Sequence, residues 1–295
     1  MFVAAIKEAA GYTRPIHTIT RNYLESFVTP GTASIFFVND EGCAITCKHV
    51  IDLIGNRQAI NEHYQRFKRE QGQLAKNNKY NQRLKALETA YNLAAGTVVE
   101  VQERFLKVSS EASLSYRWIN HPTYDLSLLI FENFSQPLYH SHARFLKDTS
   151  TLEQGKFLCR LGFPFPEFSN FQYNKDTDQI EWTNTGQADS PRFPIEGMLT
   201  RHLAHGTEIM GLEMSTPGLR GQSGGPLFNQ EGLVCGMQSV TNHLHMGFDM
   251  KNFEYKTSGH SIKVTNQPFL HVGHCIHADI IKQFLRDHHI TFFEE

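Results

Sequence analysis

The stretch Gly221-Gln222-Ser223-Gly224-Gly225-Pro226-Leu227-Phe228 decides how this 295-residue chain is interpreted. A serine that attacks a carbonyl group must stand on a tight turn, with backbone amides beside it to stabilise the oxyanion that forms. Gly221 permits the unusual torsion angles of such a turn, while Gly224 and Gly225 let the next backbone segment pass close behind the serine. The stretch therefore predicts a nucleophilic Ser223, with the amides of Gly221 and Ser223 as an oxyanion hole.

The same residues also satisfy the G-x-S-x-G pattern of the nucleophile elbow in α/β-hydrolases. That elbow leads into a helix, and its acid and histidine follow the serine in the chain. Here Pro226 is followed by the turn signal Asn229-Gln230-Glu231-Gly232 and by an apolar run at 234–240 that predicts a strand. These features argue against an esterase.

Two upstream segments supply the partners that such a serine needs. Residues 34–38 and 43–47 predict two strands joined by a turn, and His49 follows them in a run matching Thr-x-x-His-Val. Asp125 opens an apolar run at 126–131. The chain has 16 histidines, but this placement distinguishes His49, and the three residues together predict a Ser-His-Asp triad.

Five segments resemble those of the trypsin/chymotrypsin clan of serine proteases, in the clan's order of His, Asp and Ser. The turn at 161–164 and the strand 273–277 with its helix resemble the HtrA-type bacterial branch of this clan. The resemblance covers most of residues 31–290. The segments are the strand pair with His49 over 31–50, the Asp125 segment over 123–129, the nucleophile loop, the turn Leu161-Gly162-Phe163-Pro164, and the strand 273–277 with the helix after it.

The resemblance implies a mainly β fold of two six-stranded antiparallel β-barrels, with an inserted helical segment and a C-terminal helix. We expect an N-terminal segment at 1–30 and a first barrel at 31–135 that contains the insertion at 58–95. The second barrel and the C-terminal helix should occupy 136–295.

Roles follow from the same resemblance. Ser223 attacks the scissile carbonyl, His49 takes the serine proton, and Asp125 orients the imidazole. Substrate-binding positions carried over from the family are Pro217, Ser239, Val240, Thr241, Gly273 and Cys275. None of these is acidic, so we expect no acid at the base of the specificity pocket and a preference for medium apolar residues before the scissile bond.

Departures from the secreted members of the clan concern activation and redox state. Gln222 replaces the acid that pairs with a newly freed N-terminal amine in those members, so that switch cannot operate. The chain has five cysteines, an odd number, placed mostly in apolar runs, which predicts reduced and buried thiols. Its first residues do not form a secretory signal, and we expect a cytoplasmic location.

The bulk composition and the histidine groups limit the partners. A net charge of −2 indicates neither nucleic acid nor an anionic membrane as a partner, and no apolar run is long enough to span a bilayer.

Triad chemistry needs no cofactor. A zinc site requires three or four converging ligands, and no clear helix carries a histidine pair at i, i+4, so we expect no metal. The histidine groups considered are His202 with His205, His243 with His245, and His271 with His274 and His277.

The segment at 58–95 carries apolar residues at helical intervals, including Tyr64, Phe67 and Leu84. We expect two helices with a break near Gly72 or at 76–78. The pair is interpreted as a brace packed on the barrel, as a lid, or as a surface for a regulatory partner.

Two functions from different classes remain. The first is an active serine endopeptidase that hydrolyses protein or peptide substrates through an acyl-enzyme intermediate. The second is a protease-fold binding module that is inactive or gated by a partner.

Overall fold

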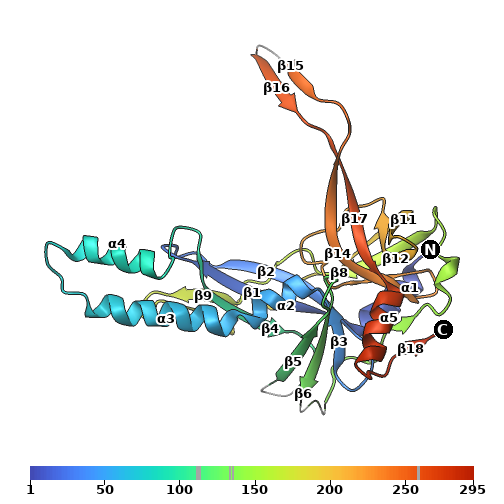
Figure 1. Cartoon of the computed structure of the whole chain (residues 1–295), viewed down its shortest axis with the longest axis horizontal. Helices are drawn as coiled ribbons and strands as arrows, with labels where there is room; N and C mark the ends of the chain where they lie inside the picture. The colour runs from blue at the N-terminus through green and yellow to red at the C-terminus, as the bar shows by residue number, and fades with distance from the viewer. Residues whose placement is uncertain (111–113, 133, 135, 258–259) are drawn as a thin grey trace.

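Strands dominate the chain and gather into two large sheets (Figure 1). The computed structural model describes residues 1–110, 114–132, 134, 136–257 and 260–295. This mainly β architecture with a C-terminal helix, α5 (Ala278–Asp287), confirms the predicted fold class.

The first sheet has six strands in the order β4-β1-β2-β3-β6-β5. All its pairings are antiparallel. It begins before residue 31, because β1 pairs with both β2 and β4. The strands are β1 (Thr13–Asn22), β2 (Thr29–Phe37), β3 (Cys43–Thr46), β4 (Val98–Phe105), β5 (Ser115–Asn120) and β6 (Ser127–Glu132).

The second sheet closes on itself. Six strands follow one another in the order β13-β8-β11-β12-β17-β14, and β13 also pairs with β14, which completes the ring. The short strands β7 (Arg144–Phe145) and β18 (Phe293–Glu294) extend this sheet beyond β14. The ring strands are β8 (Phe157–Gly162), β11 (Phe193–His205), β12 (Glu208–Met214), β13 (Pro226–Phe228), β14 (Val234–His245) and β17 (Phe269–His277).

Two hydrophobic cores follow from this arrangement. The larger joins the two sheets, and it includes Phe36 and Leu128 from the first and Leu161 and Phe228 from the second. Helices α1 (Val3–Tyr12) and α5 pack on it. The smaller core fills the interior of the second barrel with Leu158, Leu199, Leu212, Met214, Leu227, Cys235 and Cys275, together with Leu152. All five cysteines are free and buried, as predicted.

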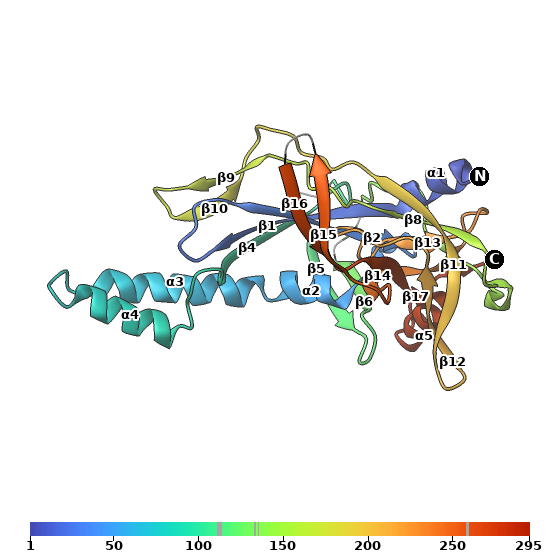
Figure 2. The ribbon, with the colours of Figure 1, turned by 90° about the horizontal axis from the view of Figure 1, so that it is seen from above.

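Three hairpins project from this body (Figures 1 and 2). Helix α2 (Lys48–Gly55) leads into α3 (Arg57–Gln73), which packs against α4 (Tyr80–Ala90), and the break between α3 and α4 falls where the sequence predicts it. The other two are β9 (Phe171–Asn174) with β10 (Gln179–Trp182), and β15 (Met250–Thr257) with β16 (His260–Asn266). A 3-10 turn at Thr149–Thr151 completes the elements. No helix in the described ranges combines the length and apolar character that crossing a membrane requires.

Helix α3 braces the exposed edge of the first sheet. The side chain of Asn61 accepts a hydrogen bond from the Val101 amide at 2.9 Å and donates one to the Val101 carbonyl at 3.0 Å. Such pairing satisfies the backbone of edge strand β4. Below it, Phe67 packs with Tyr23, Tyr64, Leu93 and Val99 in a separate apolar cluster, which is the predicted packing of this helix on the barrel.

Replacing Phe67 with alanine tests this brace. Phe67 is fully buried, so Phe67→Ala should lower the free energy of unfolding by about 3–5 kcal/mol. Urea denaturation monitored by circular dichroism measures the change. Phe27 is 60% exposed, and Phe27→Ala is the matched control, expected within about 0.5 kcal/mol of wild type. Equal stability of the two variants would contradict the assigned role of Phe67.

Candidate active site

The pairing of β3 with β6 brings His49 and Asp125 together. Thr46, the last residue of β3, lies opposite Ser127, the first residue of β6. Because the strands are antiparallel, the residues just after β3 meet those just before β6. His49 stands in the first turn of α2, with its Nδ1 atom 2.8 Å and 3.0 Å from the two Asp125 carboxylate oxygens. The His49 amide also donates to Asp125 Oδ1 at 2.9 Å.

The Asp125 carboxylate has a further donor from the second barrel. Ser239 Oγ donates to Asp125 Oδ2 at 2.6 Å. Burial by itself raises the pKa of Asp125, but the hydrogen bonds from His49 and Ser239 outweigh it and hold the pKa below the ordinary value. Asp125 is therefore ionised near neutral pH and can orient the His49 imidazole.

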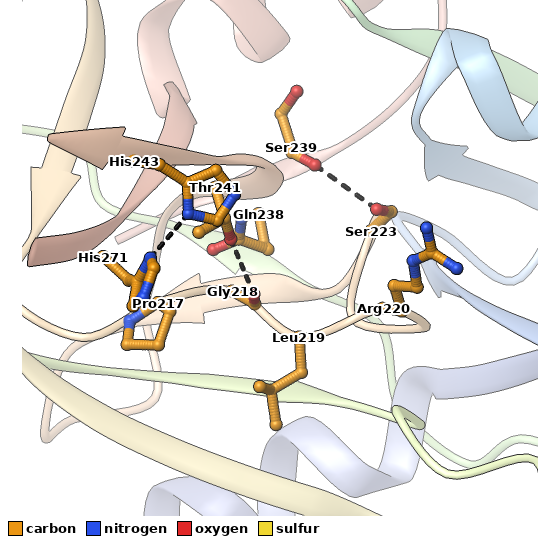
Figure 3. A pocket seen from close by; sticks show the side chains of 10 residues that line it. All are labelled: Pro217, Gly218, Leu219, Arg220, Ser223, Gln238, Ser239, Thr241, His243 and His271. Atoms are coloured by element: carbon orange, nitrogen blue, oxygen red, sulfur yellow. Dashed lines mark hydrogen bonds between the residues drawn. The ribbon is translucent and has the colours of Figure 1, made fainter. Parts of the chain in front are cut away.

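Ser223 stands on the predicted tight turn, beside a cleft of about 470 Å³ that His49 also lines. Ser223 Oγ donates to the Ser239 carbonyl at 3.3 Å (Figure 3). Among the hydrogen bonds of the described residues, none joins Ser223 Oγ to His49. Such bonds are often long or absent in ligand-free enzymes and shorten when substrate binds.

The first barrel holds the nucleophile loop in place. Ser34 on β2 donates its amide to the Ser223 carbonyl at 2.9 Å and its hydroxyl to the Gly221 carbonyl at 2.8 Å. Gln222 is fully buried; its side chain accepts from the Leu219 amide and donates to the Phe193 carbonyl. The loop is therefore fixed from both sides.

The glycines around Ser223 are required by close contacts. Gly221 has φ +91°, and Gly224 has φ +83°. A Cβ atom at Gly224 would lie 2.1 Å from the Ser34 carbonyl oxygen, and one at Gly225 would lie 2.1 Å from the Leu161 carbonyl oxygen. These contacts match the close backbone passage expected from the sequence.

The proposed oxyanion-hole amides have no acceptor among the residues that the structure describes. Within the described part of the chain, no hydrogen bond uses the amide of Gly221 or of Ser223. Both amides are thus available to an oxygen atom of a ligand, which is what an oxyanion hole requires.

A pocket of about 440 Å³ opens next to Ser223 (Figure 3). Three of the predicted substrate-binding residues line it: Pro217, Ser239 and Thr241. Thr241 Oγ1 donates to the Gly218 carbonyl at 2.6 Å and ties the two walls together. The remaining lining residues are Gly218, Leu219, Arg220, Ser223, Gln238, His243 and His271, and no acid is among these described residues.

The other three predicted substrate-binding residues lie outside this pocket. Val240 is 49% exposed and lines a neighbouring hollow beside Asp125. Gly273 and Cys275 are buried, and Cys275 Sγ approaches Gln238 Oε1 at 3.6 Å. Gln238, rather than these two residues, provides the wall.

Arg160 was not predicted as a site residue, and its guanidinium lies against this wall. Arg160 Nη1 donates to Gln238 Oε1 at 2.6 Å, and the side chain is fully buried. A cation in the middle of the apolar run Phe157-Leu158-Cys159-Arg160-Leu161 was the available signal, because charged residues are seldom fully buried without a reason.

One group of metal-ligand types occurs in the described residues, and it overlaps the site. Ligand atoms of Cys47, His49 and Asp125 lie within 4.8 Å of one another. Burial raises the pKa of the Cys47 thiol well above its ordinary value, and the Asp125 oxygens already accept hydrogen bonds. A protonated thiol is a poor metal ligand, so this arrangement suits a triad better than a metal. In the described ranges, the histidine groups weighed from the sequence form no such cluster.

Comparison with known proteins identifies a peptidase family. The family model of the trypsin-like peptidase domain matches residues 31–237, which is more than half of the chain. Comparison with curated proteins gives no match. Among solved structures, the chain is similar to an HtrA-type protease, AlgW, with a tripeptide, at 13% sequence identity and a TM-score of 0.47. That match covers 97% of this chain and 62% of the other, so this chain spans less than two thirds of that protein's length.

The family match, together with the two-sheet fold, identifies the class of protein. This chain belongs to the family of trypsin-like peptidase domains.

Proposed function

We propose that this protein is a serine endopeptidase that hydrolyses peptide bonds through a triad of Ser223, His49 and Asp125. The observation that carries the proposal is the Asp125 carboxylate, which accepts hydrogen bonds from the His49 imidazole at 2.8 Å and from Ser239 at 2.6 Å. With Nδ1 directed at Asp125, the Nε2 atom of His49 is left to act as a base.

The reaction follows from these positions. Ser223 Oγ attacks the scissile carbonyl carbon and passes its proton to His49 Nε2, while the carbonyl oxygen becomes an oxyanion facing the Gly221 and Ser223 amides. The C–N bond then breaks, and the leaving amine takes the proton from His49. Water, activated by His49, hydrolyses the acyl-enzyme and restores the Ser223 hydroxyl.

The substrate is proposed to be an extended segment of a protein or peptide. Residues 240–242 of β14 pair with β17 on one side, and Val240 is half exposed beside Asp125. An extended chain that adds to such an edge gains backbone hydrogen bonds. A cytoplasmic location and a regulatory partner on the α3–α4 hairpin stay predictions.

A second candidate is a protease-fold module that a partner gates. It is favoured by the hydrogen bond of Ser223 Oγ to the Ser239 carbonyl, because the serine must leave that bond to reach His49. A fluorophosphonate distinguishes the two functions, since labelling needs an activated Ser223 and a usable oxyanion hole. Labelling of the isolated chain supports the endopeptidase, and labelling only after a partner is added supports gating.

The triad assignment predicts large losses from single substitutions. Ser223→Ala and His49→Ala should each lower kcat for peptide hydrolysis roughly 10⁴–10⁶-fold while leaving the circular dichroism spectrum unchanged. Steady-state hydrolysis of a quenched fluorescent peptide library gives the rates. Turnover of purified Ser223→Ala at the wild-type rate would rule out this mechanism.

Ser239 is predicted to be a positioning residue that acts through Asp125. Ser239→Ala removes a hydrogen bond to a charged group, so kcat/KM should fall roughly 10–100-fold, chiefly in kcat. Ser150 offers the matched control, because its hydroxyl donates to the Asp148 carboxylate at the same 2.6 Å on an exposed turn. Ser150→Ala should keep wild-type kinetics. Similar kinetics of the two variants would show that Ser239 has no positioning role.

A further inference from the structure

Arg160 places a positive charge inside the second barrel. Side chains alternate along β8, so Arg160 shares a face with Leu158, which belongs to the apolar core of this barrel. The Arg160 side chain is fully buried and is the largest one so buried in the described part of the chain. Burying a guanidinium among apolar side chains is costly unless an opposite charge compensates it.

The described contacts of Arg160 are all with neutral groups. Nη1 donates to Gln238 Oε1 at 2.6 Å, and Nη2 donates to the Thr216 carbonyl at 2.9 Å and to the Thr216 hydroxyl. Nε is buried with no hydrogen-bond partner. Of the carboxylates in the described residues, none forms an ion pair with Arg160, and the titratable groups that influence its pKa are the thiols of Cys275 and Cys159.

The charge therefore stays unbalanced. Burial lowers the pKa of Arg160, but an arginine side chain remains protonated at any physiological pH. Glu213, three residues before Thr216, is engaged elsewhere by Arg201 and His274.

The guanidinium lies one side chain away from the pocket beside Ser223. Gln238 lines that pocket and accepts from Arg160 on its other side. Thr216, the second anchor of Arg160, directly precedes the lining residue Pro217. Gly273 makes the room, because a Cβ atom there would lie 2.2 Å from Arg160 Nη1.

The pocket lining itself adds one arginine and two histidines, and no acid is among the described residues that line it. Arg220, His243 and His271 line it, and His243 Nδ1 lies 2.5 Å from His271 Nδ1 (Figure 3). The hydroxyls of Ser239 and Thr241 already donate to Asp125 and to the Gly218 carbonyl. An anionic side chain would thus meet positive charge from Arg160 behind Gln238 and from Arg220 in the lining.

We propose that this pocket selects an acidic residue, Glu or Asp, before the scissile bond, and that the buried charge of Arg160 determines this specificity. The inference rests on the proposed endopeptidase function. It replaces the apolar preference expected from the sequence, because a charge behind Gln238 acts through a medium of low dielectric constant and is little screened by water.

The test compares how fast matched probes inactivate the whole protein. Three peptidyl diphenyl phosphonates differ only in the side chain at the position before the scissile bond, which is that of Glu, Gln or Leu. Each forms a bond from phosphorus to Ser223 Oγ and releases phenol, so the rate reads pocket preference without turnover. Glu and Gln have the same shape, and their ratio isolates the effect of charge. The Glu probe should react roughly 10-fold or more faster than the other two.

Two variants assign the preference to Arg160. Arg160→Met removes the charge, and Gln238→Glu keeps the shape of the wall while placing a carboxylate on the guanidinium. Each should bring the Glu/Gln rate ratio close to one. Gln238→Glu covers the case in which Arg160→Met does not fold. Arg286→Met removes an exposed arginine that pairs with Glu294 on the C-terminal helix, and it should keep the wild-type ratio.

A small alkyl fluorophosphonate, which carries no such side chain, separates the possible failures. If it does not label Ser223, the proposed endopeptidase function fails. If it labels Ser223 but the Gln or Leu probe reacts as fast as the Glu probe, only the acidic specificity is overturned. If the Glu preference persists in both Arg160→Met and Gln238→Glu, the role of Arg160 is overturned, and the charge must come from the residues at the pocket mouth.

Discussion

The carboxylate of Asp125 is the point on which the site depends, because it binds groups from both barrels. His49 reaches it from the end of β3, and Ser239 reaches it from β14 in the other sheet. Each donor favours the ionised form, and the ionised form in turn holds both donors. A shift of one barrel relative to the other would therefore break the hydrogen bonds that orient the His49 imidazole. The packing of the two barrels thus determines the geometry of the site.

The nucleophile loop obeys a second constraint of the same kind. Ser34 on β2 hydrogen-bonds the backbone on both sides of Gln222, while Gly224 and Gly225 allow two carbonyl oxygens to approach within distances that any side chain would block. In this way β2, which pairs with the strand that leads to His49, also fixes the position of Ser223. The Gln222 side chain holds the loop by neutral hydrogen bonds.

Sequence predicted the parts of the site that are encoded by contiguous residues. The glycines around Ser223, the turn before His49 and the apolar run after Asp125 are local signals, as is the break between α3 and α4. The walls of the pocket are formed by residues that lie far apart in the sequence. The pairing of β14 with β17 shifts register between Gln238 and Val240, which leaves Ser239 as an extra residue directed at Asp125. A strict alternation cannot anticipate that bulge, and no local pattern shows that Gln238, rather than Gly273 or Cys275, forms the wall of the pocket.

The buried charge of Arg160 is stronger evidence for a ligand preference than an apolar pocket wall would be. A core that only had to be filled would be at least as stable with an apolar side chain at this position, since neutral partners do not repay the desolvation of a guanidinium. Its hydrogen bonds to Gln238 and Thr216 hold the guanidinium next to the pocket beside Ser223. Only glycine fits at position 273, because a Cβ atom there would collide with the Arg160 guanidinium. The second barrel thus carries a buried positive charge next to the pocket, which supports the proposed preference for an acidic residue.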